Sequence, residues 1–243
     1  DGDIYTQRFE RGNIKTNLEI VGKTDKTGTL VRFKPDAEIF KETTEFDFEI
    51  LKTRLREQAF LNAGIHIQIS DERDPDNIIC ENFCYEGGIS SFVEYLNKKK
   101  AVELVHPDII HFSTVADDDQ ATAEVAMQYN DSYNELILSF ANNIHTTDGG
   151  THEEGFKRSL TRVMNDYARK YNLLKDSDKN LTGDDVREGL TVVISIKVKD
   201  AQFEGQTKAK LGNTEISGLV SNMMNDKLST YLEENPATAR AIF

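Results

Sequence analysis

Apolar and polar residues along this 243-residue chain recur with two different periods, which predict strands in some stretches and helices in others. Alternation is typical of a strand with one buried face, and it occurs in 17–33 (as a hairpin that turns at 24–28), 65–70, 78–85, 109–115, 122–129, 135–141 and 190–199. Apolar residues three and four positions apart are typical of a helix that buries one side, and they occur in 45–62, 90–97, 151–171 and 216–232, with a short helical turn at 183–188. Strands and helices in this mixed order predict an α+β fold rather than a doubly wound sheet.

Two local signals refine this prediction. Thr151 and Glu154 have the spacing of a capping box, so we expect them to start the helix that follows the glycine-rich loop 145–150. A run of three lysines at 98–100 ends a short helix, and Pro107 follows it. We place a domain boundary there, which divides the chain into 1–104 and 105–243.

The composition is that of a globular protein with a proper core, since 29% of the residues are charged and 38% are hydrophobic. There is no apolar run of about 18 residues, which a membrane-spanning helix would need, and no signal-peptide pattern at the start. We therefore expect a cytoplasmic protein. The chain starts at Asp1 and a helical pattern continues to Phe243, which we interpret as the two ends of a piece of a longer polypeptide.

With a formal net charge of −13, the protein surface as a whole repels phosphates, so the chain is not a general binder of nucleic acid. Any contact with nucleic acid must come from a local basic patch. The two cysteines, Cys80 and Cys84, stand four residues apart in a predicted strand. Four strand residues span about 13 Å, too far for a disulfide, so we expect two reduced, buried thiols.

The loop 202–212 follows a predicted strand and precedes a helix, so its side chains should point outward at the end of the strand. Within it, Gln206 and Lys208 stand two residues apart. An ammonium group and a neutral amide donor together suit a phosphate. By its spacing alone this is a weak signal, and a solvated loop lysine, as we expect of Lys210, is the alternative.

Three segments together carry a resemblance to a known family. They are 27–36 (TGTLVRFKPD), 142–152 (NNIHTTDGGTH) and 183–190 (GDDVREGL), the last followed by 206–208 (QTK). The chain resembles the type II topoisomerase B subunits over essentially its whole length, and among them it looks most like the DNA gyrase B subunits. The B subunit of topoisomerase IV shares these motifs and stays the nearest alternative.

The resemblance implies a fold and a function. Residues 1–104 would be the C-terminal part of a GHKL-type ATPase domain, an α/β sandwich, and residues 105–243 a transducer domain with a ribosomal protein S5 domain 2-like fold. The complete subunit would use ATP and Mg²⁺ to drive DNA strand passage and negative supercoiling. Its partners would be the gyrase A subunit, which carries the nicking tyrosine, a second B subunit and double-stranded DNA.

The resemblance also implies which residues contact the nucleotide. Lys208 and Gln206 would both reach the γ-phosphate, and Thr29 would line the adenine pocket, although a threonine in a strand is the ordinary alternative. The ATP-lid glycines, the magnesium-binding asparagine, the general-base glutamate and the adenine-binding aspartate of the family are not matched in this chain. We therefore expect this chain by itself neither to bind nor to hydrolyse ATP, and to hold no metal.

A basic stripe follows the predicted helix 151–171. Arg158, Arg162 and Arg169 lie within about 40° of one another at about 100° per residue, opposite the apolar side, and Lys157 flanks them. An ordinary solvated face would look the same. In the family this helix borders the cavity that receives the transported DNA, which implies non-specific phosphate attraction by Lys157, Arg158 and Arg162.

Two other interpretations are weaker. His145 and His152 flank a tight glycine turn without a third ligand at helical spacing, so a metal site is not expected. An interaction module of another GHKL-superfamily protein, without topoisomerase activity, would share the general layout. It would lack 183–190 followed by the Gln-Thr-Lys loop, and would expose an apolar patch for its client.

Overall fold

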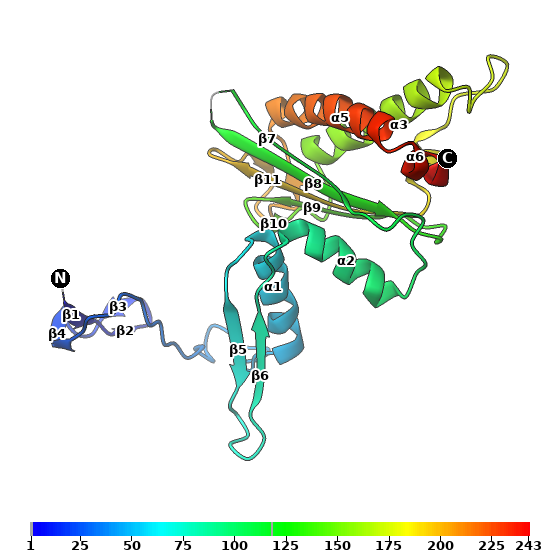
Figure 1. The fold of residues 1–243 in the computed structure, drawn as a ribbon. Coiled ribbons are helices and arrows are strands. Elements are labelled where there is room, and N and C mark those ends of the chain that lie inside the picture. Colours follow the sequence, from blue (N-terminus) through cyan, green and yellow to red (C-terminus); the bar gives the residue numbers. More distant parts are fainter. Residues whose placement is uncertain (1, 118) are drawn as a thin grey trace. The chain divides into compact units, whose positions relative to one another are not determined.

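The computed structural model describes residues 2–117 and 119–243. The chain forms two compact units, Asp1–Leu51 and Lys52–Phe243 (Figure 1). The boundary predicted near residue 104 falls inside the second unit. The division into an ATPase part and a transducer part stays a prediction.

The first unit contains short paired strands. Strand β1 (Asp3–Thr6) pairs antiparallel with β4 (Glu19–Lys23), and β2 (Phe9–Glu10) pairs with β3 (Asn13–Ile14). The hairpin predicted over 17–33 is therefore wrong: its first half is β4, but the partner is β1, and 29–33 form no strand. The apolar residues of 29–33 are exposed, as at Leu30 (86%). Alternation alone does not hold a strand that lacks a partner and a core.

Within the described residues, the main sheet of the second unit has five strands in the order β10-β9-β11-β8-β7. All neighbouring strands run antiparallel except β9 and β11, which are parallel. The strands are β7 (Ile110–Val115), β8 (Ala121–Tyr129), β9 (Leu136–Ala141), β10 (Ile144–His145) and β11 (Leu190–Val198). The strand predictions at 109–115, 122–129, 135–141 and 190–199 are confirmed within a residue or two.

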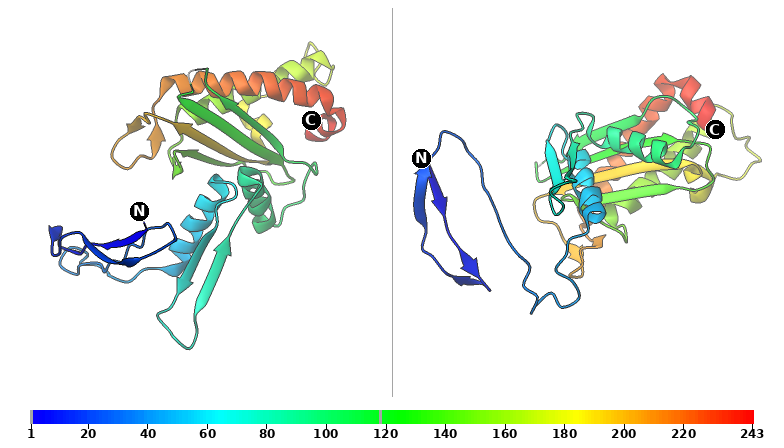
Figure 2. Two further views of the ribbon diagram at one scale, coloured as in Figure 1. Left: turned by 60° about the vertical axis from the view of Figure 1, so that its left-hand side comes forward. Right: turned by 90° about the horizontal axis from the view of Figure 1, so that it is seen from below.

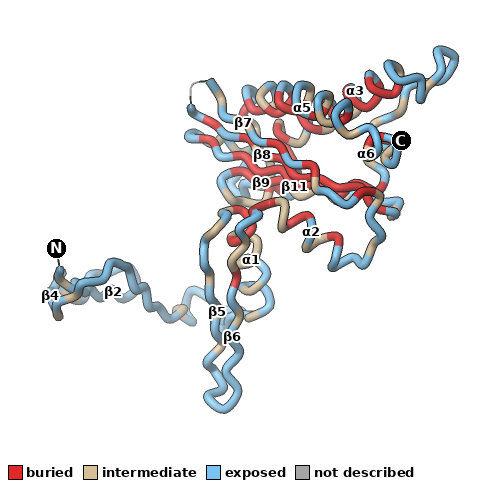
Figure 3. Tube along the Cα trace, viewed as in Figure 1, coloured by how far each residue is buried: buried red, intermediate tan, exposed pale blue. Residues whose placement is uncertain are grey.

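Helices cover both faces of this sheet, as Figures 1 and 2 show. The long helices α3 (Thr151–Lys170) and α5 (Thr214–Glu234) pack against each other and share a core with one face. Helices α1 (Phe48–Leu61) and α2 (Gly88–Lys100) contribute to a second core on the other face. Strand β11 is buried on both sides, since Val192 belongs to the first core and Val193 to the second (Figure 3).

Shorter elements complete the second unit. Strands β5 (Ile67–Asp71) and β6 (Ile79–Phe83) form an antiparallel pair, and helices α4 (Gly183–Arg187) and α6 (Pro236–Ile242) flank α3 and α5. The α+β class is confirmed. None of the helices in the described residues is both long enough and apolar enough to cross a membrane.

One local prediction, the capping box, needs correction. Helix α3 begins at Thr151, but its N-cap is Gly150, with no side-chain cap; the helical N–H of Glu154 donates to the carbonyl of Gly150. The predicted capping box is therefore wrong, because the chain enters the helix one residue earlier than a Thr151 cap would require. A capping box does form at Thr182 with Asp185, at the start of α4.

The cysteines are free, as predicted, but they are not buried. Cys80 is exposed and Cys84 is half-buried. Both lie at or just beyond β6, in a two-stranded pair where cross-strand groups such as the Ser70 hydroxyl (3.4 Å) reach the Cys80 thiol. A two-stranded pair buries little of its own surface, so its thiols keep contact with solvent.

Candidate functional site

Gln206 and Lys208 lie at the tip of a short hairpin. Strands β12 (Phe203–Glu204) and β13 (Lys210–Leu211) pair antiparallel and project the residues between them beyond the sheet. The backbone N–H of Lys208 donates to the carbonyl of Gly205 over 3.3 Å, and both residues have positive φ (56° and 83°). Both predicted phosphate-binding side chains are exposed.

The two lysines of this hairpin have different surroundings. The ammonium of Lys210 pairs with the carboxylate of Glu204 on the facing strand over 3.2 Å. The ammonium of Lys208 makes no ion pair among the described residues and lies 5.9 Å from the centre of the Phe203 ring, within reach of a weak cation–π contact. Lys208 is therefore the cation of this tip that is available to an anion.

The base of the hairpin is fixed to the glycine-rich loop before α3. The N–H of Asp148 donates to the carbonyl of Ala209 (2.9 Å), and the N–H of Leu211 donates to that of Gly149 (3.1 Å). At Gly150, with φ 138°, a Cβ atom would stand 2.4 Å from the carbonyl oxygen of Leu211. Two of the segments that carry the family resemblance, 142–152 and 206–208, are thus parts of one structure.

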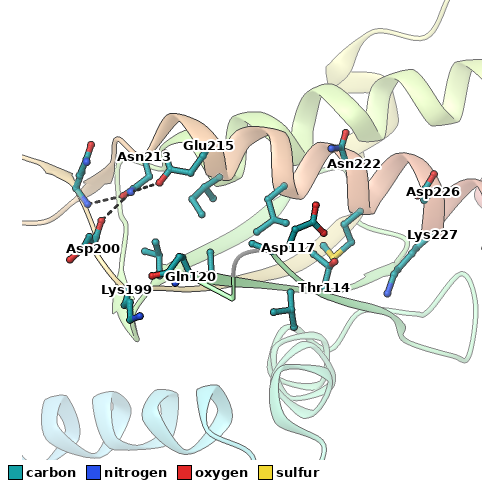
Figure 4. Close-up of a pocket in the computed structure, with 18 residues that line it drawn as sticks. Thr114, Asp117, Gln120, Lys199, Asp200, Asn213, Glu215, Asn222, Asp226 and Lys227 are labelled. Carbon is teal, nitrogen blue, oxygen red and sulfur yellow. Dashed lines mark hydrogen bonds between the residues drawn. The ribbon is translucent and has the colours of Figure 1, made fainter.

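Asn213 closes the base of the hairpin from the other side. Asn213 is 2% exposed. Its Oδ1 accepts a hydrogen bond from the N–H of Gln202 (2.7 Å). Its Nδ2 donates to the backbone carbonyl of Asp200 (3.1 Å) and to the carboxylate of Glu215 (2.8 Å) (Figure 4). The sequence alone did not predict a role for Asn213. An asparagine just before a helix suggests a cap, but this amide bonds across the hairpin instead.

A buried polar network lies under the glycine-rich loop. His152 is fully buried, its Nε2 lies 3.0 Å from the hydroxyl of Thr146, and that hydroxyl is 2.8 Å from Ser139. Ser139 in turn donates to Glu153 over 3.0 Å, and Glu153 pairs with Lys157 over 2.7 Å. Burial lowers the pKa of His152 to about 4, so the imidazole is neutral at physiological pH.

The two histidines that flank the loop do not converge on a metal site. His145 stacks on Phe140, with ring centres 5.0 Å apart, and burial lowers its pKa. His152 bonds to Thr146. No group of three or more candidate metal ligands exists among the described residues.

The basic residues of α3 are engaged in different ways. Lys157 pairs with Glu153, and the guanidinium of Arg158 donates to the hydroxyls of Ser217 (3.0 Å) and Ser221 (3.3 Å) on α5. Arg169 donates to the side chain of Asn180 and to carbonyls of the following loop. Arg162 is the most open of them, with 71% of its side chain exposed and a loose 3.6 Å pair with Asp166.

Thr29 lies in the first unit, in an exposed stretch without regular structure. Of the other predicted site residues, Gln206 and Lys208 lie together at one hairpin tip, and Lys157, Arg158 and Arg162 lie along helix α3. The proposed contacts of all six residues with nucleotide or DNA stay predictions.

Comparison with known proteins identifies the family. Residues 88–243 match the family model described as DNA gyrase B. The chain is 52% identical over 242 residues to the DNA gyrase B subunit of Clostridium acetobutylicum, covering all of this chain and 37% of that protein. It is also 52% identical to the DNA gyrase B subunit of Bacillus mycoides, with 58% of that protein covered. The chain thus spans 37% and 58% of the length of these two relatives.

Solved structures agree with this result. The 43K ATPase domain of Thermus thermophilus gyrase B, in complex with an aminocoumarin, superposes with a TM-score of 0.83 at 36% identity, covering all of this chain and 64% of that one. The ATP-binding domain of topoisomerase IV from Francisella tularensis, in complex with a small-molecule inhibitor, gives 0.79 at 29% identity, with 64% of that chain covered.

Proposed function

This chain belongs to the DNA gyrase B family, and we propose from that premise that it is the part of the gyrase B protein that couples ATP to DNA strand passage. In this proposal residues 1–104 end the ATPase domain and 105–243 are the transducer. The whole subunit would hydrolyse ATP and drive negative supercoiling, together with the gyrase A subunit, a second copy of the gyrase B protein and double-stranded DNA.

The observation that carries the proposal is the exposed pair at the hairpin tip. Lys208 has no ion pair within the described part of the chain, and Gln206 lies beside it on a tip fixed at its base. An ammonium and an amide donor on a hairpin whose base is hydrogen-bonded to the glycine-rich loop fit the terminal phosphate of a nucleotide. The group that the tip would contact is the terminal phosphate of ATP, which binds together with Mg²⁺ and is lost on hydrolysis. The family residues that hold the rest of the nucleotide have no match here, so this chain by itself is expected to be inactive.

The coupling would follow from a contact between the tip and the bound nucleotide. A nucleotide held by the ATPase domain and touched by a hairpin of the transducer favours the arrangement in which both contacts exist. Loss of the terminal phosphate removes the contact with Lys208 and Gln206, and with it the preference for that arrangement. In the same proposal, Thr29 contributes to the adenine pocket.

DNA would meet the transducer along α3. Lys157 pairs closely with Glu153, so it would attract phosphates less strongly than Arg162, whose pair with Asp166 is loose (3.6 Å) and whose side chain is 71% exposed. The serine hydroxyls that bind Arg158 are neutral and leave its charge in place. The attraction would be non-specific and would weaken as the salt concentration rises.

The B protein of topoisomerase IV is the second candidate, favoured by the structural similarity of its ATP-binding domain. The relatives at 52% identity are gyrase B proteins, which supports gyrase. Introduction of negative supercoils by the complete enzyme, in contrast to relaxation and decatenation only, separates the two activities.

The experiment that tests the proposal is Lys208→Ala in the complete subunit. A charge-assisted contact is worth about 1.5–3 kcal/mol, so ATP turnover should fall by about tenfold to a hundredfold, with unchanged thermal unfolding. Lys210→Ala is the matched control, because Lys210 pairs with Glu204 instead. Turnover within about twofold of the wild type in Lys208→Ala would remove the proposed role of this residue.

A further inference from the structure

A cavity of about 860 Å³ opens in the second unit between helix α5 and the adjoining ends of β7, β8 and β11. Figure 4 shows side chains of α5 along one wall and those of the strand ends along the other. Its size lies within the range of about 300–1,000 Å³ that is typical of small-molecule sites. None of the residues proposed above to contact nucleotide or DNA lines it.

The wall combines an apolar floor with a negatively charged rim. Buried apolar side chains form the floor, among them Ala121, Val198, Ile216 and Met223. The rim carries two ammonium groups, Lys199 and Lys227, and four carboxylates, Asp117, Asp200, Glu215 and Asp226.

Lys199 and Lys227 offset only part of this charge, because four carboxylates face two ammonium groups. The ammonium of Lys227 donates to the backbone carbonyl of Ser113 over 2.5 Å and makes no ion pair with the described carboxylates of the rim. Asp117, Asp200 and Asp226 make no ion pair within the described part of the chain. An anion would therefore be repelled, whereas a cation would find several carboxylates without an ion pair around one apolar floor.

From this combination we propose that the cavity binds a small organic cation, an aliphatic skeleton that carries protonated amines, and that this ligand regulates the hairpin described above. The skeleton would cover the floor and release water from apolar surface. Its amines would lie at the carboxylates of the rim. The proposed regulation rests on the proposed function of Gln206 and Lys208. The proposed binding of the cation does not.

The link to the hairpin is Asn213, which lines the cavity and is 2% exposed. Its Nδ2 donates to the backbone carbonyl of Asp200 and to the carboxylate of Glu215, and its Oδ1 accepts from the N–H of Gln202. The carbonyl of Gln202 accepts in turn from the N–H of Gly212 over 2.7 Å. An amine that draws the Glu215 carboxylate toward itself pulls on this amide. The base of the hairpin shifts with it, and so does the tip.

The test uses hexane-1,6-diamine as the probe and hexane-1,6-diol as its uncharged equivalent of the same length. Binding to the 243-residue chain is measured by calorimetry and by NMR shifts of the Asn213 side chain and the Gln206 and Lys208 amides. Asp117→Asn and Asp226→Asn remove rim carboxylates that make no ion pair with any described residue. Asp166→Asn is the matched control, an exposed carboxylate on α3 outside the cavity.

We expect one saturable diamine site, no detectable diol binding, and shifts at Asn213 and at both tip amides. Each rim variant should weaken binding by about twofold to fivefold, whereas Asp166→Asn should not change it. Absence of saturable binding, equal affinity in all variants, or equal binding of the diol would overturn the site. Saturable binding that leaves the tip amides unmoved would overturn the regulation. A failure of Lys208→Ala to reduce ATP turnover would instead contradict the proposed function and leave this site standing.

Discussion

At the scale of single residues, Lys208 and Lys210 differ in whether a carboxylate of the protein compensates their charge. Both are lysines of one short hairpin, yet one faces a carboxylate across the ladder and the other reaches solvent beside an aromatic ring. The pairing register places Lys210 opposite Glu204. Lys208 lies in the turn between the two strands, so no residue of the facing strand is paired with it and its charge has no carboxylate opposite.

His152 provides a pH prediction. Its pKa is about 4 in the folded protein because of burial and about 6.5 when unfolded. Since the unfolded state binds the proton more readily, the stabilisation is complete above about pH 6.5 and is lost as the pH falls toward 4, by up to about 1.4 kcal/mol per pH unit. Urea unfolding at about pH 7 and about pH 5, on either side of the unfolded pKa, should show this loss, and His152→Asn should reduce it. An identical pH dependence in the variant would contradict the prediction.

The site residues differ in how far the sequence predicts them. The exposure of Gln206 and Lys208 could be predicted because a loop between a strand and a helix exposes its side chains. Asn213 and the Thr146–His152 contact could not, since their partners are set by how separate segments pack. The alternation around Cys80 predicted a strand correctly, but periodicity does not tell how many strands cover it, and this cysteine is exposed.

At the scale of elements, the glycine-rich loop and strand β13 form one joint. Gly150 lies against Leu211 with φ 138°, where any side chain would meet the backbone of that residue. The close contact at Gly150 and the hydrogen bonds beside it hold the loop and the hairpin in place relative to each other. Movement of one would break the hydrogen bonds between Asp148 and Ala209 and between Gly149 and Leu211.

We expect Gly150→Ala to destabilise the protein by about 2–4 kcal/mol, because a Cβ requires both a strained φ and a shift of backbone. The control is Gly218→Ala in the second turn of α5, where a Cβ meets nothing within 4 Å. There alanine should be neutral or stabilise the helix by up to about 1 kcal/mol. Chemical denaturation measures both. Equal stability of Gly150→Ala and the wild type would show that the joint is looser than its geometry implies.

Strands and helices with a strong period were predicted close to their observed bounds, because each contributes one buried face to a sheet or core. The hairpin at 17–33 and the cap at Thr151 were not, for a common reason. Both predictions used the residues that follow directly along the chain, whereas β4 pairs with the preceding β1 and Gly150, at the start of α3, pairs with the distant Leu211. Periodicity does not tell which segment becomes the partner at these two places.

At the scale of the whole molecule, the net charge of −13 makes any attraction of DNA depend on local cations. Arg162→Glu in the complete enzyme should weaken DNA stimulation of ATP turnover, and should lower the slope of log affinity against log salt by about one per lost phosphate contact. Lys179→Glu, an exposed charge reversal outside α3, serves as the control. Equal effects of the two variants would point to general charge rather than to this helix.

The proposed coupling depends on recognition of the terminal phosphate by the hairpin tip. The most direct test measures the affinity of the complete subunit for a non-hydrolysable ATP analogue and for ADP, in the wild type and in Lys208→Ala. The wild type should prefer the triphosphate, and the variant should lose most of this preference, with little change in its affinity for ADP. An unchanged ratio of the two affinities in Lys208→Ala would contradict recognition of the terminal phosphate by this tip.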